Sequence, residues 1–136
     1  MEFHITQLSQ WEEVVQSILP HLQHPLLLLK GNLGAGKTTF TSELVRQLGS
    51  QDAVSSPTYA LINTYYGKDL KIYHFDLYRL NSPSEALDFG IDEYLEETGT
   101  FCIIEWPEIY EQELVQYPHH QISITNEGDY RHVIFN

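Results

Sequence analysis

The sequence predicts an α/β fold around a mixed sheet, with parallel core strands flanked by antiparallel hairpin strands and helices on both faces. Residues 26–29 and 100–105 are almost continuously apolar, which is typical of strands that are covered on both faces. Segments with helical spacing of apolar residues alternate with these strands, as in the α/β class. Turn sequences at residues 67–69 and 126–129 each separate two strand-like segments and predict two hairpins.

The N-terminal part is expected to hold two strands and two helices. Residues 2–6 read as a short strand, which precedes the buried strand at residues 26–29. Ser9 and Glu12 have the spacing of a capping box, so a helix should begin there. Its apolar positions recur at helical spacing, and they are Trp11, Val14, Val15, Ile18, Leu19 and Leu22. A second helix is predicted over residues 39–48, ended by Gly49.

The remainder of the chain is expected to be richer in strands. Ser82 followed by Pro83 is a typical helix start, and it predicts a short helix through Leu87. Further helical segments are expected at residues 91–97 and, as one or two turns, at residues 109–115. The predicted strands are residues 59–66 and 70–77 in the first hairpin, 100–105 in the core, and 121–125 and 130–135 in the terminal hairpin.

Size and charge limit the function classes. With 136 residues, we expect one domain over residues 1–136. The formal net charge is -12, with only seven Lys and Arg and no basic cluster, whereas unaided nucleic-acid binding needs a basic footprint. The acidity therefore serves either solubility or docking on a basic protein surface.

The chain has one cysteine, Cys102, so an internal disulfide and a cysteine-based metal cage are excluded. Its apolar neighbours predict a small buried hydrophobic side chain. His4, Glu12 and Glu13 interrupt the first residues, which argues against a signal peptide. The apolar run at residues 25–29 is too short to span a bilayer. We expect a cytoplasmic protein with no membrane partner.

The strongest functional motif follows the first buried strand and precedes the second helix. It matches G-x-x-x-x-G-K-[ST], and it reads Gly31, Asn32, Leu33, Gly34, Ala35, Gly36, Lys37 and Thr38. In such a loop, backbone N–H groups and the helix N-terminus surround phosphate oxygens. Lys37 should reach the β and γ phosphates, Thr38 should coordinate Mg²⁺, and Thr39 could contact the α phosphate. The motif predicts a P-loop NTPase-like fold and a nucleoside triphosphate site.

Two acidic residues are candidates for the metal and for catalysis. Glu105 ends the buried strand, where it could bind Mg²⁺, directly or through water, or act as the base that orients the attacking water. Asp76 shares one strand face with His74 and Tyr78, and it could bind Mg²⁺ through water or polarise the nucleophile. The structural alternatives are a plain strand-end glutamate and an ion pair between Asp76 and Arg79.

Three other features have less decided interpretations. Thr58, in the segment 55–58, could sense the γ phosphate, or the segment could be a simple turn. His119 and His120 are expected to form a solvated loop and not a metal site. Trp106, which follows Glu105, is either a core residue or a contact surface.

Four motifs in this order resemble the bacterial TsaE family, also called YjeE. The loop continues as Lys37-Thr38-Thr39-Phe40, and the other three motifs are Ser56-Pro57-Thr58-Tyr59, His74-Phe75-Asp76-Leu77-Tyr78-Arg79 and Glu105-Trp106. One departure is Asn32, where the family often has Asp. Since that side chain should face away from the phosphates, we expect little effect on nucleotide binding.

The resemblance implies an ATPase that is weak alone and works with TsaB-like and TsaD-like proteins. Together they make threonylcarbamoyladenosine beside the anticodon of tRNA, and this subunit would reach tRNA only through the complex. The resemblance also implies that Lys37 and Thr38 bind phosphate and Mg²⁺, and that Asp76 and Glu105 serve the metal and the water. The scarcity of arginine agrees with slow turnover alone, because efficient phosphoryl transfer usually aims an arginine at the γ phosphate.

Other readings remain open from the residues. A small-molecule kinase shares the loop but needs an acceptor pocket and usually an arginine-bearing lid. A GTPase switch lacks support because no Asn-Lys-x-Asp motif is present. A nucleotide-binding interaction module without turnover would make Asp76 and Glu105 merely structural.

Overall fold

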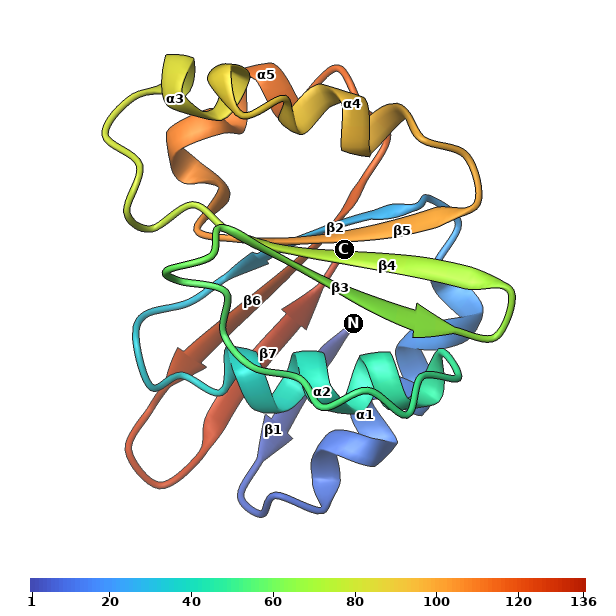
Figure 1. The fold of residues 1–136 in the computed structure, drawn as a ribbon. Coiled ribbons are helices and arrows are strands. Elements are labelled where there is room, and N and C mark those ends of the chain that lie inside the picture. The colour runs from blue at the N-terminus through green and yellow to red at the C-terminus, as the bar shows by residue number, and fades with distance from the viewer.

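A single seven-stranded sheet forms the centre of the computed structural model, which describes residues 1–136 (Figure 1). The strands are β1 (Glu2–Ile5), β2 (Leu26–Lys30), β3 (Ile62–Gly67), β4 (Leu70–Asp76), β5 (Thr100–Glu105), β6 (His120–Asn126) and β7 (Arg131–Phe135). Their order across the sheet is β1-β7-β6-β2-β5-β4-β3. The four strands β6, β2, β5 and β4 are parallel, whereas β3 on one side and β7 and β1 on the other pair antiparallel. The predicted mixed sheet with hairpins at its flanks is confirmed.

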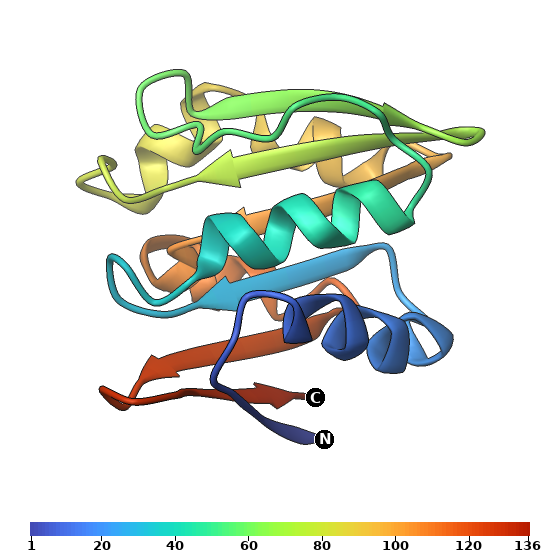
Figure 2. The same ribbon diagram turned by 90° about the horizontal axis from the view of Figure 1, so that it is seen from below.

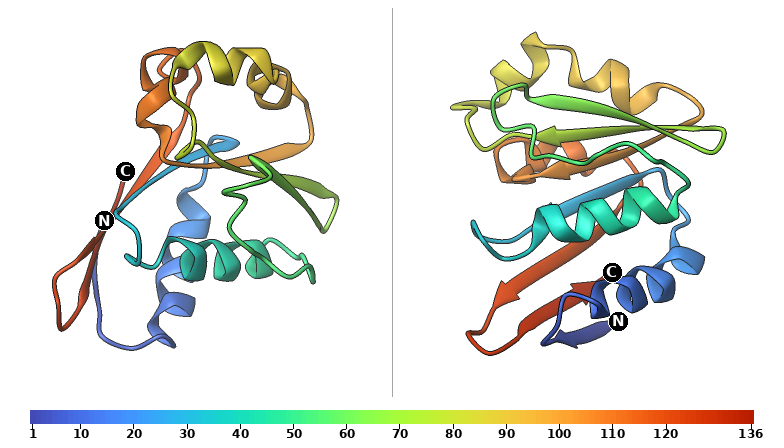
Figure 3. Two further views of the ribbon diagram at one scale, coloured as in Figure 1. Left: turned by 60° about the vertical axis from the view of Figure 1, so that its left-hand side comes forward. Right: turned by 60° about the horizontal axis from the view of Figure 1, so that its bottom comes forward.

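Helices cover both faces of this sheet, as predicted. The helices α1 (Gln10–Ile18) and α2 (Lys37–Gln47) lie across one face, which Figure 2 shows from below. The other face carries α3 (Pro83–Asp88), α4 (Ile91–Glu96) and α5 (Glu111–Leu114), so that the side view in Figure 3 shows three layers. Two short 3₁₀ helices, η1 (Leu19–His21) and η2 (Pro107–Tyr110), extend α1 and precede α5.

Each face of the sheet has its own hydrophobic core, and β2 contributes to both. Leu27 and Leu29 pack in the larger core beneath α1 and α2, while Leu26 and Leu28 pack in the core beneath α3 to α5. All four side chains are buried, because neighbouring residues of a strand point to opposite faces. The apolar run therefore covers both faces, as expected for a central parallel strand.

The pairing register brings the ends of three central strands together. Glu105 at the end of β5 pairs with Leu29 of β2 on one side and with Asp76 of β4 on the other. Since these strands are parallel, their carboxyl ends meet at one edge of the sheet. The two candidate acids thus lie side by side there, although 29 residues of sequence separate them.

One predicted helix start and one predicted helix cap need correction. The helix α2 begins at Lys37 and not at Thr39, so Lys37 and Thr38 belong to its first turn. Ser9 lies in a helical backbone conformation and makes no capping hydrogen bond, so the predicted capping box is wrong. Instead, the Gln10 side-chain oxygen accepts hydrogen bonds from the amides of Thr6 and Gln7.

The first hairpin is shorter than its sequence suggested. The strand β3 begins at Ile62, whereas residues 58–60 form a turn, closed by the Leu61 amide, which donates to the Pro57 carbonyl at 2.7 Å. Leu61 adopts a left-handed conformation with φ 68°, which ends the turn and is incompatible with a strand. The β-favouring tyrosine in this segment thus lies in a loop, where Tyr59 is 87% exposed.

The prediction for the histidine pair is wrong for His120. This residue begins β6 and is buried, and its Nε2 accepts hydrogen bonds from the amides of Gln23 at 2.9 Å and His24 at 3.1 Å. Burial lowers the pKa of His120, an effect that nearby His24 and His119 reinforce. It thus ties the connector before β2 to the sheet.

Cys102 is buried in β5, as predicted, and burial raises the pKa of its thiol to about 12. None of the helices has the length and apolar character needed to cross a lipid bilayer.

Candidate functional site

The Gly-rich loop connects β2 to α2 and curls at the edge of the sheet where the central strands end. Gly36 has φ 112°, a conformation that residues with a Cβ rarely adopt, and a Cβ there would lie 3.0 Å from the Trp11 ring. At Gly31, a Cβ would lie 2.8 Å from the Ile124 carbonyl oxygen of β6. The loop is fixed further by Arg131, whose Nε donates to the Ala35 carbonyl at 3.1 Å. Its glycines are therefore required by close approach and by conformation.

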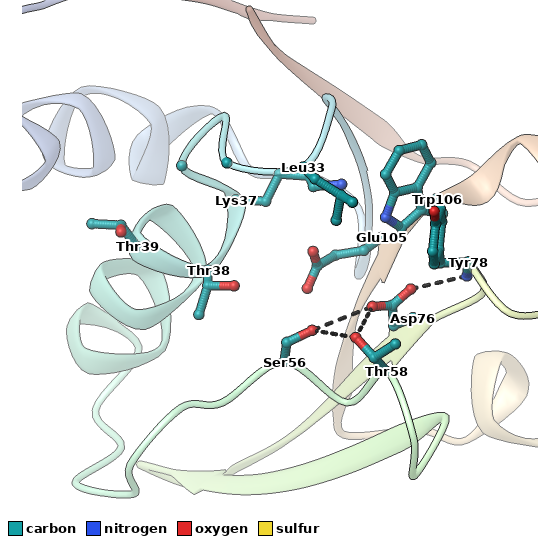
Figure 4. Close-up of a pocket in the computed structure, with 12 residues that line it drawn as sticks. Leu33, Lys37, Thr38, Thr39, Ser56, Thr58, Asp76, Tyr78, Glu105 and Trp106 are labelled. Atoms are coloured by element: carbon teal, nitrogen blue, oxygen red, sulfur yellow. Dashed lines mark hydrogen bonds between the residues drawn. The ribbon is translucent and has the colours of Figure 1, made fainter. Parts of the chain in front are cut away.

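A cavity of about 400 Å³ opens between this loop and the ends of β4 and β5 (Figure 4). The predicted site residues that line it are Leu33, Gly34, Gly36, Lys37, Thr38, Thr39, Thr58, Asp76 and Glu105. Three further lining residues, Ser56, Tyr78 and Trp106, were not predicted as ligand contacts. Figure 4 shows the Thr38 hydroxyl pointing to the side of the cavity where Glu105 lies, while Thr39 points away from it.

Two predicted loop residues lie outside this cavity. Ala35 is buried, and its side chain packs in the larger core. Asn32 lines a separate depression beside Lys30 and Ser123, and its carbonyl accepts the Ala35 amide at 3.1 Å. The position of Asn32 agrees with the expectation that its side chain faces away from the phosphate side.

Lys37 is the central cation of the cavity. Its side chain is only 6% exposed, and its Nζ lies 3.8 Å from the centroid of the Trp106 ring. This Nζ has no hydrogen-bond partner, which is uncommon for a buried ammonium group. Burial lowers the pKa of Lys37, and the nearby charges of Glu105 and Asp76 oppose that change. The ammonium group thus lacks a direct anionic partner.

Asp76 is buried at the end of β4 and is hydrogen-bonded to the loop that faces α2. Its Oδ2 accepts hydrogen bonds from Thr58 Oγ1 at 2.9 Å and Ser56 Oγ at 3.3 Å, and its Oδ1 accepts the Tyr78 amide at 2.9 Å. The alternative ion pair with Arg79 is absent, because that guanidinium lies 4.6 Å from the Tyr59 ring centroid. Segment 55–58 is therefore more than a turn, since it holds a carboxylate of the cavity.

Glu105 is buried beside Asp76 and has a histidine as its partner. His74 Nε2 donates to Glu105 Oε2 at 2.5 Å, and His74 Nδ1 lies 3.0 Å from the Tyr65 hydroxyl. From the sequence, His74 was predicted to share a strand face with Asp76. Neither its hydrogen-bond partners nor a role for Tyr65 was predicted. No local pattern could supply these contacts, because Glu105 is 31 residues from His74.

Trp106 forms one wall of the cavity. Its backbone is left-handed with φ 54°, which turns the chain out of β5, and its ring centroid lies 4.8 Å from that of Tyr78. The ring thus covers the Lys37 ammonium group and also contacts Tyr78, which follows β4. Of the two interpretations offered by the sequence, the contact surface agrees with this position.

Comparison with known proteins identifies close relatives. A family model described as "Threonylcarbamoyl adenosine biosynthesis protein TsaE" matches residues 5–133. The chain is 43% identical over 104 residues to the tRNA threonylcarbamoyladenosine biosynthesis protein TsaE of Bacillus subtilis, covering 76% of this chain and 63% of that protein. The corresponding protein of Treponema pallidum is 39% identical over 109 residues, covering 80% of this chain and 78% of the relative.

The fold agrees with these relationships. The crystal structure of Bacillus subtilis YdiB superposes with a TM-score of 0.76 and 30% sequence identity, over 99% of this chain and 83% of that one. The chain spans just over half to nearly two thirds of the length of the first three curated relatives it matches. Because the family model extends from β1 to β7 and includes every residue that lines the cavity, the chain belongs to the TsaE family.

Proposed function

We propose that this protein binds ATP with Mg²⁺ in the cavity, hydrolyses it slowly to ADP and phosphate, and thereby supports threonylcarbamoyladenosine modification of tRNA. The observation that carries the proposal is the buried Lys37 ammonium group, which has no hydrogen-bond partner beside two buried carboxylates. Unpaired buried charges are costly, so such an arrangement favours a ligand that brings both an anion and a cation. A magnesium–triphosphate complex has this composition.

The phosphate groups would contact the loop and the start of α2. Lys37 would reach the β and γ phosphates, and the backbone amides of the loop would surround them, aided by the positive end of the helix. Leu33, Gly34 and Gly36 line the cavity at this position. Asn32 and Ala35 would contribute only through their backbone amides. Thr39 would contact the α phosphate. Thr58, whose hydroxyl is bonded to Asp76, would lie near the γ phosphate.

Magnesium would be held by Thr38, Asp76 and Glu105. The chain contains no group of three or more His, Cys, Asp or Glu side chains placed to hold a metal ion. This fits Mg²⁺, which is usually bound through one or two carboxylates, with waters and substrate phosphates completing its shell. When bound, the ion neutralises charge on the phosphate oxygens.

Glu105 is the proposed base that orients the attacking water. Its Oε2 is held by His74, while the carboxylate lines the cavity. None of the three arginines lines the cavity: Arg46 pairs with Glu43, Arg79 lies over Tyr59, and Arg131 donates to Ala35. An arginine near the γ phosphate contributes strongly to rate in related chemistry, so slow turnover is expected without a partner.

The proposed partners are TsaB-like and TsaD-like proteins, and tRNA would be reached only through their complex. Two observations support this. The relatives are named for threonylcarbamoyladenosine biosynthesis, and the net charge of -12 favours docking on a protein over direct contact with tRNA. The partners would supply what the isolated cavity lacks for rapid hydrolysis.

The test measures phosphate release from ATP in Mg²⁺, with and without a TsaB–TsaD pair. We expect slow release alone and a clear increase with the pair. Glu105→Ala should lower the rate by about 100-fold or more, while ATP affinity in calorimetry changes little. Full hydrolysis by this variant would remove Glu105 from the mechanism. Transfer of the γ phosphate to a small metabolite would favour a kinase, and binding without any release would favour a non-hydrolysing module.

A further inference from the structure

We propose that His74 and Tyr65 are positioning residues that hold the Glu105 carboxylate and connect it to the loop at residues 55–58. The proposal rests on the proposed ATP hydrolysis, because it assigns these residues a role through Glu105. Neither side chain lines the cavity, so neither would touch ATP. Their contribution would be to fix the geometry of groups that do.

A continuous series of contacts runs from the cavity through three strands to the loop. It begins with Glu105 of β5 and His74 of β4, which lie 2.5 Å apart between Oε2 and Nε2. His74 Nδ1 is hydrogen-bonded to the Tyr65 hydroxyl of β3 at 3.0 Å. That hydroxyl also lies 3.1 Å from the Ser55 carbonyl oxygen. Asn63, the neighbour of Tyr65 along the same strand face, donates to the same carbonyl at 3.1 Å.

The sheet register explains why these side chains meet. His74 pairs with Ile103, two residues before Glu105, so His74 and Glu105 are diagonal neighbours on one face. Diagonal neighbours are within reach of each other when their side chains are long or aromatic. His74 also pairs with Asn63, which places Tyr65 diagonally on its other side. The contacts among Glu105, His74 and Tyr65 thus depend on the pairing of three strands.

The burial of these groups indicates that their orientation is fixed. His74 is fully buried, and Tyr65 and Glu105 are 3% and 2% exposed. Buried polar groups are stable only when hydrogen-bonded, and a fully bonded network restricts each member to one orientation. The Glu105 carboxylate is therefore held by its partner and cannot rotate freely toward Lys37.

The same loop is also fixed to the other carboxylate. The hydroxyls of Ser56 and Thr58 contact Asp76, while Ser55, next to them, contacts Tyr65. Asp76 and Glu105 are thus connected to one short segment by two separate routes. Removing the Tyr65 hydroxyl should loosen the segment and the Glu105 carboxylate together, although the Asp76 contacts remain.

The decisive variant is Tyr65→Phe, which removes one oxygen and keeps the buried ring. Its matched control is Tyr110→Phe on the opposite face, where a buried hydroxyl donates to Asp92 at 2.9 Å. Single-turnover ATP hydrolysis should slow by about 10- to 100-fold in Tyr65→Phe, with ATP affinity in calorimetry little changed. Deuterium uptake by amides 55–61 should rise in the same variant. The control should lower the melting temperature comparably, with rate and uptake unchanged.

A second pair of variants distinguishes a role of His74 in orienting the Glu105 carboxylate from a role in protein stability alone. His74→Gln retains a side-chain N–H that can reach Glu105, so it should keep part of the rate that His74→Leu loses. Equal rates in Tyr65→Phe and Tyr110→Phe would overturn the proposal. If the unaltered protein itself binds or hydrolyses no ATP, the proposed function fails, but the exchange measurement still applies. Unchanged uptake at amides 55–61 in Tyr65→Phe would then show that Tyr65 does not hold the loop.

Discussion

Asp76 and Asp92 lie on opposite faces of the sheet, and each accepts hydrogen bonds from two side-chain hydroxyls. Asp92, in the first turn of α4, accepts from Tyr110 at 2.9 Å and Tyr117 at 2.8 Å. Asp76 accepts from Thr58 and Ser56, which belong to a loop. The partners of Asp92 pack their rings in the core beneath α3 to α5, whereas Asp76 opens into the cavity that contains Lys37.

The two carboxylates differ in whether the polar groups around them all have hydrogen-bond partners. Burial, followed by the hydrogen bond to Asp92, raises the pKa of Tyr110 to about 12, and the same causes raise the pKa of Tyr117. That network is closed, and it serves stability. Beside Asp76, in contrast, the Lys37 ammonium group remains without a partner. Similar hydrogen bonds therefore support a stable core on one face and a site prepared for a charged ligand on the other.

Among variants that test the difference between the two faces, the largest expected effect is on nucleotide binding. Lys37→Ala should weaken ATP binding by about 100-fold or more, since it removes the one cation that lines the cavity. Thermal stability should hold or rise, because the substitution also removes a buried ammonium group without a partner. Calorimetry and thermal unfolding measure the two quantities. Unchanged ATP affinity would refute the assignment of the loop.

On the opposite face, a substitution is expected to lower stability and to leave ATP affinity unchanged. Asp92→Ala leaves two tyrosine hydroxyls without their acceptor, so the free energy of unfolding should fall by about 2 kcal/mol. ATP affinity at saturating Mg²⁺ should not change. Urea unfolding together with calorimetry tests both statements. A loss of ATP affinity as large as that of Lys37→Ala would mean that the two faces are not independent.

The smallest effect concerns His120, which is buried at the amino ends of the parallel strands. Because burial lowers its pKa in the folded protein, the unfolded chain binds a proton at higher pH than the folded one. The stability that neutral His120 contributes is therefore present above the ordinary histidine pKa of about 6.5 and is lost as pH falls below it. His120→Gln, which keeps an acceptor, should make the free energy of unfolding less dependent on pH between 7 and 5. An unchanged slope in urea titrations would assign the dependence to other groups.

Features that depend on neighbouring residues were predictable from the sequence. The apolar run of β5, the Gly-rich loop and the two hairpins follow local rules, and the mixed sheet follows from their order. Glu105 could be predicted as a site residue because it ends a buried strand, and Asp76 because it shares a polar strand face with His74 and Tyr78. Their proximity required the additional rule that carboxyl ends of parallel strands meet at one edge.

Features that depend on pairing across the sheet were not predictable. The contact of His74 with Glu105 and Tyr65 requires the register of three strands, and two of these strands are distant in sequence. The burial of His120 depends on backbone amides of residues 23 and 24, which no pattern around His120 reveals. Leu61 reads as a strand residue, but the hydrogen bond to Pro57 overrides its local preference.

The register between β4 and β5 limits which sequence changes this site can tolerate. Asp76 and Glu105 are neighbours because each pair of residues before them is also aligned, from Lys71 opposite Thr100 onward. A single inserted residue within β5 would turn the Glu105 side chain to the opposite face of the sheet, which carries the other core. Insertions in the turn between β3 and β4 would leave that alignment intact. The backbone hydrogen bonds between β4 and β5 thus fix the distance between the two acids. Substitutions can change the chemistry of these two positions, but an insertion or deletion within either strand would separate them.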